Sequence, residues 1–349
     1  MWFKNIYVYR LTRPFEISPE QLGEHLEALC FAPCTNQQVV SSGWVPPLGP
    51  TSEAYTHAAN GRIMLCLRRQ EKVLPAAVVN EAVDEHIGAI EAAEHRKVSR
   101  KERDKVKDEV IFTLMPRAFA RSSLHYAYID AGAGLVVVNA SSTKRAEELL
   151  DELREAIGSL PVIPLRPKGN PGQMMTSWLL AGTPPEGFGF GHECELRDPS
   201  EEGGIVRCKY QDLLSEEINN HLKAGMTATK LGLSWLGGID CMIDDQLGIK
   251  RLKFDDLIEE RADDLDAEGA AAQFDADFVL MTEELSGFFR DLLQAFGGED
   301  LPEGMPAVGA ATPVEANAAA EQVESDAPAV ASEPASELEP EPLAPAERA

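Results

Sequence analysis

Alternating apolar and polar residues predict strands in the first half of the chain. Residues 2–11 alternate in this way, residues 62–69 are expected to form another strand, and residues 124–130 and 135–139 flank a glycine-bearing turn that is typical of a hairpin. Successive side chains of a strand point to opposite faces, so each segment can bury one face against a core. These segments indicate a sheet.

Apolar residues three or four positions apart predict helices between the strands. Ser18, Pro19 and Gln21 combine a helix cap, a proline in the first turn and a capping-box partner. Another helix is expected from about Thr143 to a stop at Gly158.

Composition divides the chain into four parts and predicts an α+β fold with mixed sheets. Residues 1–75 and 116–170 form an N-terminal α/β substructure, and residues 76–115, rich in Ala, Glu, Lys and Arg, form an inserted charged helical hairpin that projects from it. Residues 171–298 form a C-terminal α+β substructure. Residues 299–349 are mostly Ala, Pro and Glu, and should be a disordered acidic tail because they bury too little apolar surface.

The C-terminal part is expected to hold an antiparallel sheet plus helices. Its strands are predicted at residues 205–210, 226–236, 239–244 and 247–254, and a final apolar-striped helix at 276–296.

The net charge of −26 at first argues against a nucleic-acid partner, but the acidic residues are segregated. Residues 299–349 and residues 255–284 each hold twelve acids and one base, a net −11 apiece, so the rest of the chain carries only −4. Within that rest, residues 96–107 carry seven bases and two acids. The average charge therefore says little about any one face.

Signatures of catalysis are missing from the sequence. It has no GxxxxGK[ST] loop, no HExxH and no GxSxG motif, and its six cysteines lack paired metal-ligand spacing. The glycine-rich segment 187–191 is interpreted as a flexible turn. The acid pairs Asp244–Asp245 and Asp255–Asp256 could bind a divalent metal, although a cap or a solvated turn is the commoner use. No catalytic residue, metal or cofactor is expected, and no apolar run approaches the ~20 residues of a membrane span.

Strand parity groups basic side chains. Arg207 and Lys209 share one face of their strand, Lys230 lies opposite the apolar face of the next, and Arg251 and Lys253 lie opposite apolar residues of the last. If these strands share one sheet, the bases form a compact surface suited to a phosphate backbone. The alternative, ordinary solvated strand faces, is favoured by composition alone.

A second candidate segment surrounds Phe119. Arg117 and Arg121 flank this phenylalanine directly after the charged hairpin. An exposed phenylalanine between cations could pack on a partner or touch DNA. Equally, it could anchor the base of the hairpin in a core.

Twelve segments in order and spacing resemble the RdgC family over residues 1–298. They are WFKNIYVYRL at the start, GWVPPLG at 43–49, HAANGRI at 57–63, EKVLP at 71–75, KDEV at 107–110, LMPRAFAR at 114–121, GSLPVIPL at 158–165, TSWL at 176–179, QDLLSEEINNHL at 211–222, TKLGLSW at 229–235, KRLKF at 250–254 and FDADFVLMTEEL at 274–285.

The resemblance implies a nucleoid-associated cytoplasmic protein that forms a ring-shaped homodimer with a basic central hole for duplex DNA and that antagonises the RecA recombinase. It implies that Arg117, Phe119 and Arg121 lie near the hole or at a dimer contact, and that Lys209 and Lys230 line the hole. The family pattern has a basic residue where this chain has Tyr210.

The function expected from the sequence is sequence-independent binding of double-stranded DNA, with single-stranded DNA as a further candidate partner. The contacts would be Arg117, Arg121, Arg207, Lys209, Lys230, Arg251 and Lys253, with Phe119 as a dimer or gate contact. A rival class is a protein-interaction regulator that binds the recombinase directly. A metal-dependent nuclease is a more distant rival, based on the acid pairs.

Overall fold

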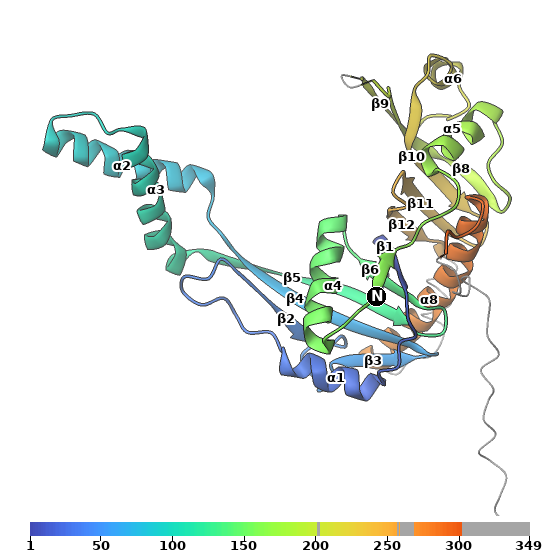
Figure 1. Cartoon of the computed structure of the whole chain (residues 1–349), viewed down its shortest axis with the longest axis horizontal. Helices are drawn as coiled ribbons and strands as arrows, with labels where there is room; N and C mark the ends of the chain where they lie inside the picture. Colours follow the sequence, from blue (N-terminus) through green and yellow to red (C-terminus); the bar gives the residue numbers. More distant parts are fainter. Residues whose placement is uncertain (201–202, 257, 259–268, 302–349) are drawn as a thin grey trace, which may run out of the picture. The chain divides into compact units, whose positions relative to one another are not determined.

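The structure, a computed structural model, describes residues 1–200, 203–256, 258 and 269–301, which belong to one compact unit. Its central feature is a single sheet in the order β2-β4-β5-β6-β1-β12-β11-β10-β8-β9, with β3 paired to β4 and β7 paired to β1 (Figure 1). The strands are β1 (Asn5–Leu11), β2 (Val40–Val45), β3 (Thr56–Ala59), β4 (Arg62–Val73), β5 (Phe119–Asp130), β6 (Leu135–Asn139), β7 (Val162–Pro164), β8 (Phe188–Arg197), β9 (Ile205–Lys209), β10 (Thr227–Trp235), β11 (Ile239–Asp244) and β12 (Ile249–Phe254).

Helices cover parts of both faces of this sheet. The helices are α1 (Pro19–Ala28), α2 (Ala76–Glu94), α3 (Arg100–Leu114), α4 (Thr143–Ile157), α5 (Pro171–Ala181), α6 (Glu216–Lys223) and α8 (Ala270–Ala295), of which α2 and α3 do not pack on the sheet faces, and a short 3-10 helix η1 (Met115–Arg117) precedes β5. The predicted capping box of α1 is present, since Ser18 accepts a hydrogen bond from the backbone of Gln21 and the Gln21 side chain accepts one from Ser18. Gly158, with φ 78°, ends α4 as expected.

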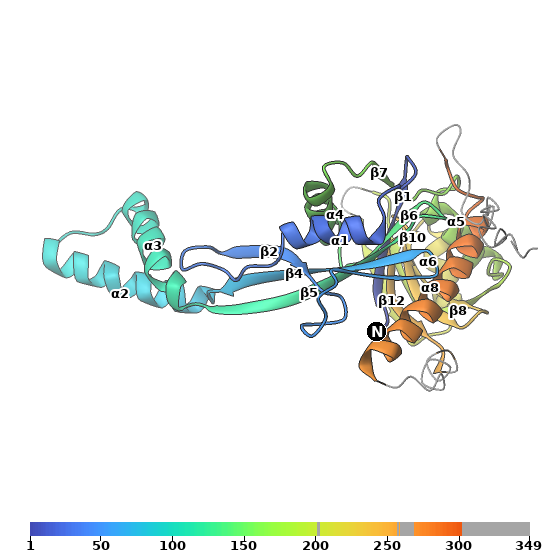
Figure 2. The same cartoon turned by 90° about the horizontal axis from the view of Figure 1, so that it is seen from below.

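Two hydrophobic cores lie on opposite faces of the sheet. On one face, α1 and α4 cover Tyr7 and Tyr9 of β1 together with odd-numbered residues of β4 and β5. On the other, α5, α6 and α8 cover Ile6 and Val8 of β1 and the apolar side of β8 to β12. Figure 2 shows α1 and α4 on one side of β4 and β5, with α8 beginning on the other.

The helices α1 and α4 cover only part of their face of the sheet. Their cluster takes residues from β1, β4, β5 and β6 but none from β8 to β12 among the residues that the structure describes. The polar face of β8 to β12 is therefore not buried under α1 and α4. This open face belongs to the same side of the sheet as Tyr7.

The region 76–115 contains the two predicted helices, α2 and α3. They pack on each other through Val79, Val83, Val106 and Val110, a small core separate from the other two. Ser99 caps α3, and Glu102 completes its capping box. The pair follows β4 and precedes β5, and Figure 1 shows it beyond the ends of these strands.

Several expectations about the sheet were wrong. The mixed sheets are one sheet, in which every pairing between the strands named above is antiparallel. It runs through both parts of the chain, because Asn5 and Ile6 of β1 pair with Lys250 and Ile249 of β12. Strands β2, β3 and β7 were not predicted, and β4 and β5 extend further than 62–69 and 124–130.

The glycine-rich segment 187–191 was expected to be a flexible turn, but its residues 188–191 are the first part of strand β8. Gly191 of this strand lies so close to β10 that an added Cβ would be 3.1 Å from the carbonyl carbon of Gly232. Glycine here permits a close approach of two strands. The final helix begins at Ala270 rather than at residue 276. Most of the acidic tail lies outside the described residues.

Candidate nucleic-acid interface

The basic residues predicted from strand parity lie together on the open face. Arg207 and Lys209 of β9 stand opposite Glu195 and Glu193 of β8, and Lys230 of β10 also pairs with Glu195. Their apolar neighbours turn the other way into the core under α8. The bases of β9 and β10 thus share one surface, as strand parity predicted.

Ion pairs hold most of these cations in place. Glu195 is shared, with its carboxylate oxygens 2.7 Å from Arg207 Nε and 2.9 Å from Lys230 Nζ. Partial burial opposes the charge on Glu195, but the hydrogen bonds from Arg207 and Lys230 outweigh it and lower the pKa of Glu195 to about 2. Arg251 pairs with Glu193 in the same way.

A β-bulge adds Lys250, which the sequence did not predict, to this surface. Arg251 has a left-handed φ of 51°, and the pairing of β12 with β11 shifts register next to it. A bulge inserts an extra residue, so Lys250 and Arg251 both project to the polar side. Lys250 lies 2.9 Å from Asp244, which raises the pKa of Lys250 although partial burial opposes its charge. Its ammonium also lies 5.9 Å from the centre of the Tyr7 ring.

These side chains surround a hollow of about 380 Å³, which we call the basic hollow. Five cations and two carboxylates line it, so its charged lining is positive. They are Arg207, Lys209, Lys230, Lys250 and Arg251, with Glu193 and Glu195. Lys253, the remaining predicted base of β12, lies outside the basic hollow and lines a neighbouring one.

The residues around Phe119 lie elsewhere in the sheet. Arg121 and Phe119 occupy the outer end of β5, and Arg117 lies in η1. Four strands separate β5 from β10, so these residues do not line the basic hollow. The side chain of Phe119 is 88% exposed, which rules out its interpretation as a core anchor.

Both groups nevertheless face the same side of the sheet. Ala127 and Ile129 of β5 pack under α1 and α4, and Phe119 and Arg121 follow at even spacing along the same strand. Tyr7, the neighbour of Lys250, belongs to that same cluster.

A small network surrounds Arg121. It pairs with Glu71, which is also 2.6 Å from Arg69, and Arg145 from the first turn of α4 is 2.7 Å from Glu148. The hydrogen bonds from Arg69 and Arg121 lower the pKa of Glu71. Arg121 is therefore held by a carboxylate, as most cations of the basic hollow are.

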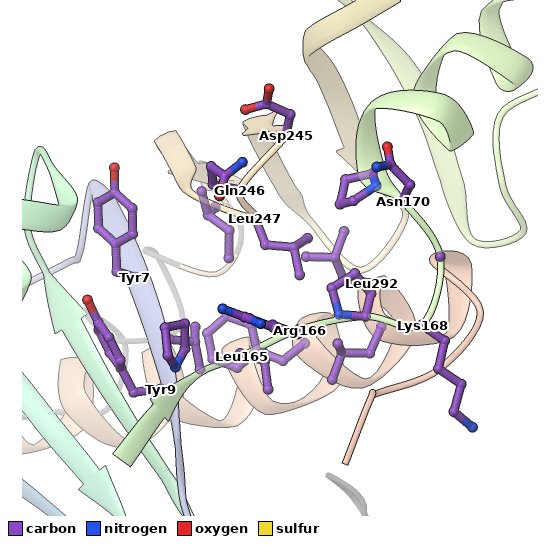
Figure 3. Close-up of a pocket in the computed structure, with 18 of the residues that line it drawn as sticks. Tyr7, Tyr9, Leu165, Arg166, Lys168, Asn170, Asp245, Gln246, Leu247 and Leu292 are labelled. Atoms are coloured by element: carbon purple, nitrogen blue, oxygen red, sulfur yellow. The ribbon is translucent and has the colours of Figure 1, made fainter. Parts of the chain in front are cut away.

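Another cavity, of about 480 Å³, lies where β1 changes its neighbour from β12 to β7. Figure 3 shows Tyr7 and Tyr9 on one side of it and Leu292 on the other. Burial raises the pKa of Tyr9 to about 12. None of the eight residues predicted from the sequence lines this cavity.

In the acid pair Asp244–Asp245, the Asp244 side chain stabilises a turn. One oxygen of Asp244 accepts hydrogen bonds from the backbone of Gly248 at 2.7 Å and of Gln246 at 3.0 Å, and the other lies beside Lys250. In the part of the chain that the structure describes, no three His, Cys, Asp or Glu side chains are grouped so as to hold a metal ion. None of the helices described has the length and apolar character of a membrane span.

A family model described as "Putative exonuclease, RdgC" matches residues 1–299. The chain belongs to the RdgC family. The matched region contains the whole open face and leaves the acidic tail of 300–349 outside.

Curated relatives support the same assignment. Each is named recombination-associated protein RdgC. The protein from Sodalis glossinidius is 45% identical over 299 residues, covering 86% of this chain and 98% of the relative. The protein from Aeromonas hydrophila subsp. hydrophila is 46% identical over 300 residues, and that from Psychromonas ingrahamii is 44% identical over 299, each covering 86% of this chain and 99% of the relative. The chain is thus a member of a recombination-associated family.

Proposed function

We propose that this protein binds double-stranded DNA without sequence preference. The observation that carries the proposal is the basic hollow, where cations from β9, β10 and β12 converge on an open sheet face and outnumber the carboxylates by five to two. Lysine and arginine contacts to phosphates supply most of the affinity of non-specific DNA binding.

The geometry favours contacts to the DNA backbone rather than to base edges. Sequence is read mainly by side chains that enter a groove, most often from a helix or a two-stranded ribbon. The basic hollow lies on the open face of the sheet and reaches its edge strand β9, so its cations can contact the outer surface of a rod-shaped polyanion. Arg121, on the same side of the sheet, would extend this contact along the DNA, and Arg117 lies four residues before it in η1.

Self-association is part of the proposal. Phe119 pairs across the strands with Val73, and both side chains are exposed. Exposed apolar pairs of this kind commonly mark contacts with another protein. We assign this pair to the contact between two copies in a ring-shaped homodimer that encloses the DNA.

The relatives' names connect this binding to recombination. A protein that covers duplex DNA without sequence preference limits the access of the RecA recombinase to the same DNA. This role needs no cofactor, and it places the protein on the cytoplasmic nucleoid. A second candidate, direct contact with the recombinase, is favoured by the exposed Phe112 of α3.

Gel-shift titration of two unrelated 30-bp duplexes, with EDTA or with magnesium, tests the proposal. We expect both duplexes to shift equally and to stay intact. Lys230→Ala combined with Lys250→Ala should weaken both shifts, whereas Lys223→Ala, an exposed lysine on α6, should not. Magnesium-dependent cleavage would instead support a nuclease. Absence of any shift would favour the second candidate, direct contact with the recombinase. Co-sedimentation with RecA measures that contact.

A further inference from the structure

A second hollow, of about 720 Å³, adjoins the basic hollow and differs from it in carrying aromatic side chains. The two share Glu193, Lys209 and Arg251. We call the second one the aromatic hollow. Its main lining residues are Trp2, Lys4, Lys209, Tyr210, Arg251 and Lys253.

Tyr210 is the feature that the duplex-binding proposal leaves unexplained. Its side chain is 90% exposed at the end of β9. Its backbone is nevertheless fixed, because Lys209 pairs with Glu193 in the sheet and the amide of Gln211 donates to His192 O at 3.2 Å. A large apolar ring is thus held in solvent by an ordered strand end.

Backbone strain is concentrated at this hollow. Tyr210 has a φ of 55° and Arg251 a φ of 51°, a left-handed conformation that bulky residues rarely adopt. Two of the five non-glycine residues with positive φ in the described part of the chain therefore line one hollow. Strained residues of this kind persist where the surrounding structure fixes them, and they cluster at binding sites.

The cations of the aromatic hollow are also available to a ligand. In the part of the chain described here, no carboxylate lies within ion-pair distance of Lys4, Lys209 or Lys253. By contrast, Arg251 is paired with Glu193. The site therefore offers unpaired positive charge around an exposed aromatic face.

An exposed aromatic ring among lysines matches one ligand chemistry well. Proteins that bind single-stranded nucleic acid stack bases on aromatic side chains and hold the flanking phosphates with cations. Inside a duplex the base faces are covered by neighbouring base pairs, so within a duplex Tyr210 has no base face on which to stack.

We propose that the aromatic hollow binds an unpaired base of single-stranded DNA, stacked on Tyr210, with the flanking phosphates held by Lys209, Lys253 and Lys4. This inference rests on the proposed DNA-binding function and gives the open face a second mode. Duplex lies over the basic hollow, and a strand end or gap reaches into the aromatic hollow next to it.

The test compares Tyr210→Ala and Tyr210→Phe in the full chain, with Leu236→Ala as the control at another highly exposed apolar position. Fluorescence anisotropy measures binding to a labelled 15-nucleotide oligo-dT and to a blunt 30-bp duplex. Loss of one stacked base should weaken oligo-dT binding by about 5- to 150-fold in Tyr210→Ala. Tyr210→Phe should retain it, and the blunt duplex should bind all variants alike.

Photocrosslinking supplies a direct readout. Oligo-dT carrying one 5-iodouracil should crosslink to the peptide that contains Tyr210, identified by mass spectrometry. Unchanged oligo-dT affinity in Tyr210→Ala, or an equal loss for duplex and oligo-dT, would overturn the inference. So would a changed sedimentation mass of Tyr210→Ala, which would assign the hollow to a contact between copies. If the wild-type chain binds oligo-dT but not duplex, the proposed function fails and this inference stands.

Discussion

Arg10 and Glu299 form a two-pronged ion pair in which the side chains are only 2% and 4% exposed. Arg10 Nε lies 2.8 Å and Nη2 2.6 Å from the two carboxylate oxygens, and Nη1 donates to the carbonyls of Ala133 and Gly134. The pair ties the central strand β1 to a residue beyond the last helix. The folded body therefore extends past Gly298, the residue at which the sequence predicted its end.

Breaking this pair should destabilise the fold strongly. Glu299→Gln leaves the buried Arg10 without a charged partner, which typically costs ~3–5 kcal/mol of unfolding free energy. Urea denaturation measures the loss. Replacing both residues, with Arg10→Met and Glu299→Leu, should recover most of the stability because no isolated charge remains. Full stability of Glu299→Gln would show that the pair contributes nothing.

The acidic tail should be removable after Leu301 but not after Gly298. Residues 302–349 carry ten acids and one base. A chain that ends at Leu301 keeps the Arg10–Glu299 pair, so it should unfold at the same urea concentration as the full chain. It should bind duplex more tightly at low salt, because fewer tail carboxylates compete for the basic hollow. The gain should vanish at high salt; a gain that persists there would mean that charge is not its cause.

The basic face could be predicted because the alternation of side chains along a strand is a local property of the sequence. In β9 and β10 the side chains of Arg207, Lys209 and Lys230 follow period two, so their common face could be read from sequence alone. Lys250 could not, because the left-handed Arg251 starts a bulge that shifts the parity. Arginine gives no local signal for such a backbone, and the shift depends on pairing with β11 and β1.

Tertiary contacts also explain where the predictions from sequence were wrong or undecided. The glycines of β8 resemble a turn, yet Gly191 is required by the close approach of Gly232. The single sheet depends on the pairing of Ile6 with Ile249, residues far apart in the chain. The exposure of Phe119 was undecided from sequence, since burial depends on what packs around a residue rather than on its type.

Lys230→Ala should reduce affinity for unrelated duplexes by the same factor. If Lys230 neutralises one phosphate, the slope of log affinity against log salt should fall by about 0.9. Unfolding free energy should fall by only about 1 kcal/mol, because Glu195 loses one of its two cationic partners and keeps Arg207. Anisotropy titrations at four salt concentrations give the slope. Lys223→Ala is the matched control, and an unchanged slope in Lys230→Ala would remove Lys230 from the interface.

Glu195→Gln should have the opposite effect on binding. Without this carboxylate, Arg207 and Lys230 are both released to phosphate, so affinity should rise and the salt slope should steepen. The same titrations measure both. Weaker binding by Glu195→Gln would mean that Glu195 positions the two cations rather than competing with DNA.

The pH dependence of stability provides a second test of Glu195. Its pKa is lowered from 4.5 to about 2, so its pairing stabilises the folded state above pH 4.5. This contribution is lost as the pH falls from 4.5 toward 2. The wild-type chain should therefore be more stable than Glu195→Gln at pH 6, and the difference should shrink at pH 3. An equal difference at both pH values in urea denaturation would contradict the assigned pairing.

Phe119→Ala should weaken self-association without changing the salt slope of DNA binding, because a phenyl ring neutralises no phosphate. Leu124→Ala is a suitable control: Leu124 is exposed on the same strand, but it lies at odd spacing from Phe119 and so on the opposite face of β5. Sedimentation equilibrium should show a larger dimer dissociation constant for Phe119→Ala alone. Retention on closed circular DNA at high salt should fall with it, since a weakened ring opens more readily. A reduced salt slope for Phe119→Ala with an intact dimer would instead place Phe119 in the DNA contact, where its loss displaces Arg117 or Arg121.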